Sequence, residues 1–113
     1  MTTKQFVIAP QDIRPLAPEK GACLASDRIT VGGQRVGFMY REAPDNTSDS
    51  GWRFFSGEES QDFADDPNNF EIYDVNTIAN YDPDIIPLLE SPAFSAFERE
   101  PKSSAFVRTD FPG

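Results

Sequence analysis

The sequence predicts an α+β fold: one small domain with an antiparallel β-sheet built from hairpins and short helices packed on it. Runs of β-branched and aromatic residues, separated by turn-forming residues, fill most of the chain. The apolar residues of 76–92 have helical spacing, but two prolines limit any helix there to short pieces. With 113 residues, 38% of them hydrophobic, the chain has the size and the apolar content for one core.

Residues 1–21 are predicted to be an N-terminal strand and an extended connection to the α+β domain of residues 22–113. The run KQFVIAP (4–10) is β-prone and ends at a proline. Two more prolines, at 15 and 18, disfavour a helix and favour extended backbone.

A β-hairpin is predicted around Gly32-Gly33. A type I′ turn needs a positive φ at both central positions, so a glycine pair between the β-prone runs 22–31 and 34–42 favours this turn. In the matching register, Ile29 lies opposite Val36 and the apolar side chains share one face.

The stretch GWRFFSG (51–57) is predicted to be the next strand, after a loop rich in turn formers. Alternation places Trp52 and Phe54 on one face and Arg53 and Phe55 on the other. Trp52 and Phe54 then join the core, whereas Phe55 needs cover on the opposite face, which we expect from a helix. Display of these rings to a partner is the alternative, but a large exposed apolar patch is unusual on a monomer.

The remaining elements follow from local patterns. EESQDFADDP (58–67) is predicted to be a short acidic helix or turn closed by a proline, and NFEIYDV (69–75) a strand with both faces partly apolar. Residues 76–92 are predicted to be helical in pieces, with Asp82 or Asp84 capping the second piece. SAFERE and SAFVRT flank the residues PKS, which predicts a closing hairpin.

Negative charge is concentrated in the middle of the chain. The net charge is −9, and residues 45–90 alone carry −11, with Arg53 as their single cation. This sign argues against nucleic acid and against an anionic membrane as partners. It suits a basic protein, whose capture electrostatic steering would accelerate. The alternative interpretation is an acidic surface that only maintains solubility.

The absence of histidine excludes several chemistries. Ser-His-Asp and Cys-His catalysis and His-ligated zinc are impossible, and no Walker loop or Rossmann fingerprint is present. We predict no catalytic residues, no metal and no cofactor, although paired carboxylates and a weak calcium-loop pattern in DNTSDS (45–50) stay open. Cys23 is the single cysteine and is expected to be a buried apolar residue of a cytoplasmic protein, because no disulfide can form within the chain. No apolar run is long enough for a membrane span or a secretory signal.

Four stretches of the chain, in this order, resemble a known bacterial family. VGFMYRE, DSGWRFFSGEE, IYDVNTIANYDPDIIPLLESP and SAFERE are similar to the family called domain of unknown function 2185, which is grouped with immunity protein family 33 of polymorphic toxin systems. The resemblance spans residues 22–100 and implies an α+β domain without a catalytic role. For some members it implies that a toxin is neutralised by binding. Phe94 departs from the pattern, since relatives tend to have a glycine there.

The resulting hypothesis is a cytoplasmic, non-enzymatic binding protein that holds a basic protein, a toxin or a nuclease, on its acidic segment; the sequence leaves the oligomeric state open. The candidate binding residues are the carboxylates Glu58, Glu59, Asp62, Asp65 and Asp66, with Asp49, Trp52, Arg53, Tyr81 and Asp82 from the resembling stretches. For Arg53, ion pairing inside the fold is a simpler interpretation than ligand binding. The alternative function is a small-ligand module with a pocket near Trp52, Tyr40 and Tyr81.

Overall fold

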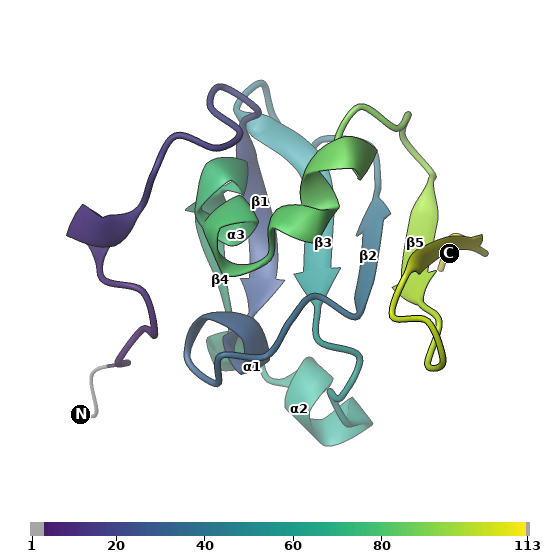
Figure 1. The fold of residues 1–113 in the computed structure, drawn as a ribbon, viewed down its shortest axis with the longest axis horizontal. Coiled ribbons are helices and arrows are strands. Elements are labelled where there is room, and N and C mark those ends of the chain that lie inside the picture. Colours follow the sequence, from purple (N-terminus) through teal and green to yellow (C-terminus); the bar gives the residue numbers. More distant parts are fainter. Residues whose placement is uncertain (1–3, 113) are drawn as a thin grey trace.

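A six-stranded mixed sheet organises the chain (Figure 1), and the computed structural model describes residues 4–112. The strands are β1 (Ala22–Ser26), β2 (Phe38–Arg41), β3 (Asp49–Phe55), β4 (Phe70–Asp74), β5 (Ala96–Arg99) and β6 (Phe106–Thr109), in the spatial order β4-β1-β3-β2-β5-β6. The helices are α1 (Asp27–Thr30), α2 (Gln61–Asp65) and α3 (Val75–Tyr81), and three 3₁₀ segments are η1 (Pro10–Asp12), η2 (Pro67–Asn69) and η3 (Pro83–Leu88). The predicted α+β class is confirmed.

The predicted antiparallel sheet is corrected in one respect, because one strand pair is parallel. β1 runs parallel to β3, with Leu24 opposite Arg53, whereas the other four pairs are antiparallel. Two of those antiparallel pairs join consecutive strands, β2 with β3 and β5 with β6. The β5–β6 pair confirms the predicted closing hairpin.

The hairpin predicted at Gly32-Gly33 does not form. After β1 the chain enters α1, where the hydroxyl of the N-cap residue Ser26 accepts a hydrogen bond from the Arg28 amide at 3.1 Å. Gly33 has a φ of +76°, and its amide donates to the Ile29 carbonyl at 3.0 Å, as at a helix end capped by glycine. The glycine pair therefore ends a helix, and the N-cap signal of Ser26-Asp27 outweighs the β-propensity of the residues that follow. The chain then passes β3 and enters β2 on its far side (Figure 1).

The strand predicted in KQFVIAP (4–10) is also wrong, because this run forms no strand and its backbone is irregular as far as η1. Its backbone is joined to the C-terminal end of α1 by a hydrogen bond from the Val7 amide to the Thr30 carbonyl at 2.8 Å. The Tyr81 hydroxyl of α3 accepts from the Ile8 amide at 3.0 Å and donates to the same Thr30 carbonyl at 3.1 Å. The Tyr81 hydroxyl thus makes a hydrogen bond to this backbone of the kind that a neighbouring strand would otherwise make.

Two asparagines of α3 hold the extended connection that follows. The Asn76 side-chain oxygen accepts hydrogen bonds from the Leu16 and Ala17 amides, both at 2.8 Å. The Asn76 and Asn80 side-chain amides both donate to the Arg14 carbonyl at 2.8 Å, and the Asn80 oxygen accepts from the Arg14 amide at 2.9 Å. Backbone that has no strand partner is therefore satisfied by side chains.

The core lies between the sheet and the layer formed by α1, α3 and η3 (Figure 1). Trp52 is 1% exposed and Phe54 is fully buried, and their rings stack with centroids 6.0 Å apart. The Trp52 indole nitrogen donates to the Leu89 carbonyl at 3.3 Å, which ties β3 to the residue after η3. The prediction that these aromatic residues anchor the sheet is confirmed.

The acidic helix, the strand at 69–75 and the two helical pieces are confirmed as α2, β4, α3 and η3. Asp82 separates the two pieces and caps η3 by accepting from the Asp84 amide at 3.1 Å. Phe94, at the position where relatives tend to have a glycine, has a φ of +72° and lies edge-to-face against the Phe111 ring. No helix within residues 4–112 is long and apolar enough to cross a bilayer.

Candidate functional site

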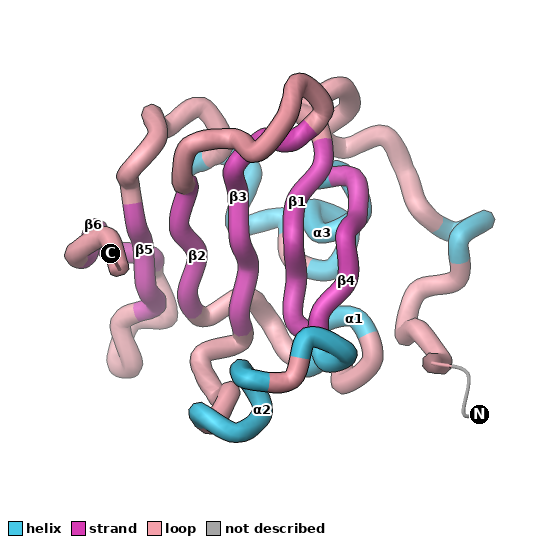
Figure 2. Tube along the Cα trace, turned by 180° about the vertical axis from the view of Figure 1, so that it is seen from behind, coloured by secondary structure: helices cyan, strands magenta, loops and turns pink. Residues whose placement is uncertain are grey.

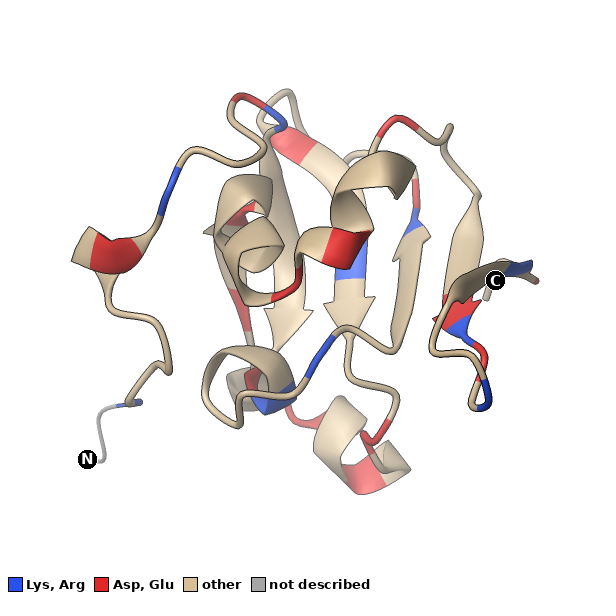
Figure 3. Ribbon diagram, in the orientation of Figure 1, with Lys and Arg blue, Asp and Glu red and all other residues tan. Residues whose placement is uncertain are grey.

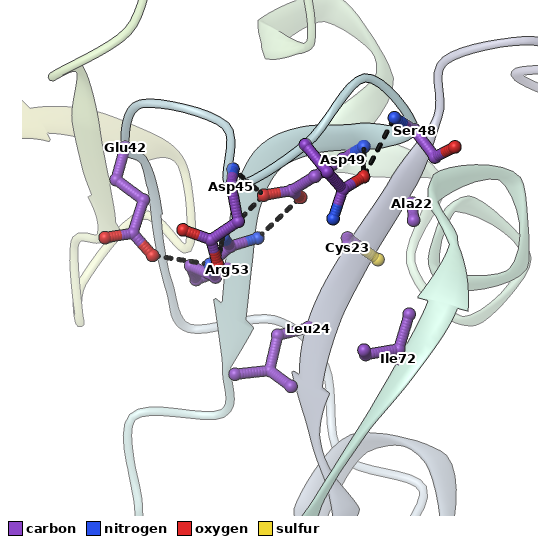
Figure 4. Close-up of a pocket in the computed structure, with 10 residues that line it drawn as sticks. Ala22, Cys23, Leu24, Glu42, Asp45, Ser48, Asp49, Arg53 and Ile72 are labelled. Atoms are coloured by element: carbon purple, nitrogen blue, oxygen red, sulfur yellow. Dashed lines mark hydrogen bonds and ion pairs between the residues drawn. The ribbon is translucent and has the colours of Figure 1, made fainter.

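The face of the sheet opposite α3 has no helix over the middle of its strands (Figure 2), and we call it the open face. Its side chains come from alternate positions of β1 to β4: Leu24, Phe38, Tyr40, Arg53, Phe55, Phe70 and Ile72. A hollow of about 360 Å³ lies here between β1, β4 and the loop from β2 to β3 (Figure 4), and we call it the acidic hollow. It is lined by Ala22, Cys23, Leu24, Glu42, Asp45, Asn46, Ser48, Asp49, Arg53 and Ile72.

Arg53 is held inside this hollow by carboxylates. Its two terminal nitrogens donate to the two carboxylate oxygens of Asp49 at 2.9 and 2.8 Å. Its Nε donates to Glu42 at 2.6 Å, and one terminal nitrogen also donates to the Trp52 carbonyl at 3.0 Å. Each guanidinium nitrogen has a partner within the chain, which confirms the interpretation of Arg53 as an internal ion-pair residue.

This pairing fixes the charges of the hollow. Hydrogen bonds from Arg53 are the main reason that the pKa of Asp49 lies far below its ordinary value, and the same pair raises the pKa of Arg53. The carboxylates of Glu42, Asp45 and Asp49 minus one guanidinium leave a net charge of −2. The Asp45 side chain is 83% exposed and lies 3.8 Å from the guanidinium, so its charge faces solvent. The hollow therefore attracts a cation, and four of the five N–H donors of Arg53 are already bound within the chain.

The opposite wall of the acidic hollow is apolar. Leu24 and Ile72 lie opposite each other in the β1–β4 register, and both point away from the core (Figure 4). Ile72 is 75% exposed, although it lies in the middle of a strand. On the other side of Leu24 lies a second hollow of about 400 Å³, which we call the apolar hollow, lined by Leu24, Phe55, Ala64, Asp65, Pro67 and Phe70.

Aromatic rings continue this apolar surface across the sheet. The Phe55 ring stacks on Tyr40 with centroids 5.8 Å apart and meets the edge of Phe70 at the same separation. We expected a helix to cover Phe55, but among the described residues no helix lies over it. Neighbouring rings cover part of Phe55 and α2 lies beside it, so Phe55 is half-buried. The open face is thus a partly exposed aromatic surface with an acidic hollow at one end.

Cys23 forms a buried part of the wall. Its side chain is 1% exposed, and burial, followed by the negative charge of Asp74, raises the pKa of the thiol well above its ordinary value. The expectation of a buried, apolar cysteine is confirmed. A thiol that stays protonated at neutral pH is a poor nucleophile.

The five carboxylates predicted from the acidic segment lie in and beside α2, beyond the ends of the strands (Figure 3). Glu58, Asp62 and Asp65 are exposed and make no ion pair within residues 4–112. Asp66 is exposed but caps η2, and Glu59 turns inward to accept hydrogen bonds from the amides of residues 56 and 57 at 2.9 and 3.0 Å. Three of the five carboxylates are therefore available to a partner without a capping role.

Three other candidate binding residues lie within the fold. Trp52 belongs to the core, and the half-buried Tyr81 uses its hydroxyl to hold the N-terminal run. Asp82 is buried, accepts from the Val36 amide at 3.0 Å and pairs with Arg99 at 2.5 Å. These side chains stabilise the connections between elements.

The pocket predicted near Trp52, Tyr40 and Tyr81 does not form. In the β2–β3 register Tyr40 lies opposite Arg53, whereas Trp52 lies opposite Arg41. Tyr40 is consequently on the open face and Trp52 is in the core, on opposite sides of the sheet. The sequence alternation was correct within each strand, but the pairing of the two strands decides which residues meet.

Eight of the ten residues that line the acidic hollow were missing from the predicted binding set, and four of these matter for its chemistry: Leu24, Glu42, Asp45 and Ile72. Glu42 is the last residue of VGFMYRE, one of the stretches that carry the resemblance. The isoleucine Ile72, among polar residues of 69–75, is a signal for an apolar side chain exposed to a partner. Their convergence depends on β1 lying between β3 and β4, which the predicted hairpin did not allow. Within the described chain no three metal-ligating side chains are grouped so that they could hold a metal ion.

A comparison with protein families now places this fold. The Immunity protein Imm33 domain matches residues 23–110, which contain nearly the whole sheet and its three α-helices. Comparison with curated proteins and with solved structures found no significant match. The family match covers most of the chain and confirms the immunity-protein resemblance seen in the sequence. The chain belongs to the Imm33 immunity protein domain family.

Proposed function

We propose that this protein is an immunity protein that neutralises a protein toxin by binding it, and that it catalyses no reaction itself. The family match over residues 23–110 is the observation that carries this proposal. The chemistry of the acidic hollow agrees with a binding role, because its arginine is paired with two carboxylates and its thiol is buried.

The partner surface in this proposal is basic. No lysine or arginine occurs between Arg53 and Arg99, and Glu58, Asp62 and Asp65 of this interval are exposed around α2. Arg28 stacks on the Phe63 ring of α2 with its central carbon 4.7 Å from the ring centroid and offsets part of the charge. A surplus of negative charge on one end of the molecule raises the association rate with a basic protein, most strongly at low salt.

Co-expression with the product of a neighbouring gene, as the candidate toxin, tests the binding. The expected result is a complex that co-purifies at a fixed stoichiometry and protects the cells from the toxin. A folded chain that neither binds that toxin nor protects against it would refute the proposal.

A pair of charge-matched variants tests the electrostatic part. The triple variant Glu58→Gln, Asp62→Asn, Asp65→Asn removes three exposed charges around α2 and leaves the Asp66 cap intact. The control variant Asp12→Asn, Glu19→Gln, Glu100→Gln removes three exposed charges from other segments, so both change the net charge from −9 to −6.

The α2 variant is expected to bind the toxin more slowly than the control by a factor of about three to ten at low salt. Stopped-flow association rates measured over a salt series report this difference. Equal rates for the two variants would mean that net charge, and not the surface around α2, controls capture.

We also propose a cytoplasmic location, which cell fractionation checks, because a chain with one buried cysteine needs no oxidising compartment.

A further inference from the structure

We propose that the open face is the toxin-binding surface and that its acidic hollow takes a lysine or arginine side chain of the toxin. This inference rests on the proposed function and adds the place and the chemistry of the contact. It differs from capture by the charges around α2, because it concerns a cavity with two chemically different walls.

The charge of the acidic hollow selects a cation. Arg53 is neutralised by Asp49 through two hydrogen bonds, so this pair contributes no net charge. Glu42 uses one carboxylate oxygen for Arg53, at 2.6 Å, and Asp45 contacts the guanidinium only at 3.8 Å. The free oxygens of these two side chains are the acceptors that the ammonium or guanidinium group of a partner would reach.

The apolar wall selects a long side chain over a small cation. Leu24 and Ile72 line the hollow across from the carboxylates (Figure 4), with Ile72 75% exposed. Lysine and arginine bury their methylene stems on apolar surface while their charged ends stay hydrated or paired. Insertion of such a side chain would cover Ile72 and satisfy the two carboxylates at once.

The apolar hollow extends the contact on the other side of Leu24. Its walls include Phe55 and Phe70, and the Tyr40 ring stacks on Phe55, so the surface is aromatic and half-buried. Aromatic patches with a polar edge are typical of the centre of a protein interface. A second copy of this chain is a poor occupant, because it would bring the same carboxylates together; a toxin segment with a basic and a neighbouring apolar side chain suits both hollows.

A small probe tests the acidic hollow without any toxin. The full chain, labelled for methyl NMR, is titrated with N-acetyl-arginine amide and, as the control, with the uncharged N-acetyl-citrulline amide. We expect saturable shifts of the Ala22, Leu24 and Ile72 methyl signals with the arginine compound only. The Asp45→Asn variant is expected to weaken that binding about threefold, and Asp12→Asn to leave it unchanged. Equal shifts with both compounds, or shifts confined to other signals, would overturn the assignment.

Toxin binding separates this inference from the proposed function. Ile72→Thr keeps a β-branched residue in β4, and the control Val7→Thr introduces the same polar residue at an apolar position of the N-terminal run that is 59% exposed. The first variant is expected to raise the Kd for the toxin about tenfold and the second to leave it unchanged. Unchanged affinity of Ile72→Thr, together with weaker binding of the α2 triple variant, would overturn this inference and retain the proposed function. A toxin that binds neither variant nor the parent protein refutes the proposed function, and the arginine titration then decides the hollow alone.

Discussion

Replacing Asp49 with asparagine should remove one of the largest polar contributions to the stability of this fold. The Asp49 carboxylate accepts two hydrogen bonds from Arg53, at 2.9 and 2.8 Å, and both side chains are largely buried. An asparagine keeps one acceptor but turns an NH₂ group toward a guanidinium nitrogen and removes the compensating charge. Hydrogen bonds to charged groups contribute about 1.5–3 kcal/mol, and breaking a buried ion pair costs about 3–5 kcal/mol. We therefore expect Asp49→Asn to lower the free energy of unfolding by about 3 kcal/mol.

Urea unfolding followed by Trp52 fluorescence measures this loss, because the indole is buried in the same strand. With an m-value of about 1.5 kcal/mol/M, the midpoint should fall by about 2 M. The matched control is Asp45→Asn, whose side chain is 83% exposed and 3.8 Å from the guanidinium, with an expected loss below about 0.5 kcal/mol. A loss below about 1 kcal/mol for Asp49→Asn, or equal losses for both variants, would refute the view that this buried ion pair within β3 stabilises the fold.

The same pair gives a pH dependence with a defined sign. The pKa of Asp49 is lower in the folded protein than its ordinary value of 3.8, mainly through the hydrogen bonds from Arg53. Its stabilisation is therefore complete above the ordinary pKa and is lost as the pH falls toward the lowered value. The stability difference between the parent protein and Asp49→Asn should be constant from pH 5 to 7 and shrink below about pH 4. A difference that grows on acidification would contradict this sign.

Three further substitutions and one chemical probe test the fold. Phe54→Ala should lower the free energy of unfolding by about 3–5 kcal/mol, because the ring is fully buried, and a loss below about 1.5 kcal/mol in urea unfolding would contradict this packing. Gly51→Ala should lower it by more than about 2 kcal/mol, since Gly51 has a φ of +88° and an added Cβ would lie 2.1 Å from the Glu42 carbonyl oxygen. Gly57→Ala shares the positive φ but meets nothing closer than 3.9 Å, so its expected loss is only about 1 kcal/mol, and equal losses would rule out the close contact. Cys23 should react with iodoacetamide at least about 100-fold more slowly in the native protein than in urea, and fast native labelling would show that β1 opens readily.

Local patterns were sufficient for the elements that form within one stretch of chain. The alternation around Trp52 predicted β3 and its buried face, the prolines at 83 and 87 predicted the split between α3 and η3, and the residues PKS between SAFERE and SAFVRT predicted β5–β6. The glycine expected by the family pattern at Phe94 corresponds to a residue with positive φ, a conformation that glycine adopts without strain.

Long-range placement was not accessible from such patterns. Gly32-Gly33 is compatible with a turn and with a helix end, and the N-cap at Ser26 together with the burial of Ile29 in the core favours the helix end. That decision moved β1 away from β2 and beside β4, which brought Leu24 and Ile72 to the open face. The charge of the acidic segment was visible in the sequence, whereas the cavity between its carboxylates and an isoleucine required the strand order.

The hold of Asn76 and Asn80 on the backbone of residues 14–17 has a consequence for where this unit starts. The family match begins at residue 23, yet Ala17 is buried in the core, and five hydrogen bonds join the two asparagines of α3 to the backbone of Arg14, Leu16 and Ala17. A recombinant fragment cut at the family boundary would lose Ala22, the first residue of β1, and would leave two side-chain amides facing water and a gap beside α3. Recombinant versions of this domain, and the sequences compared among homologues, should therefore start about ten residues upstream of that boundary, ahead of residues 14–17.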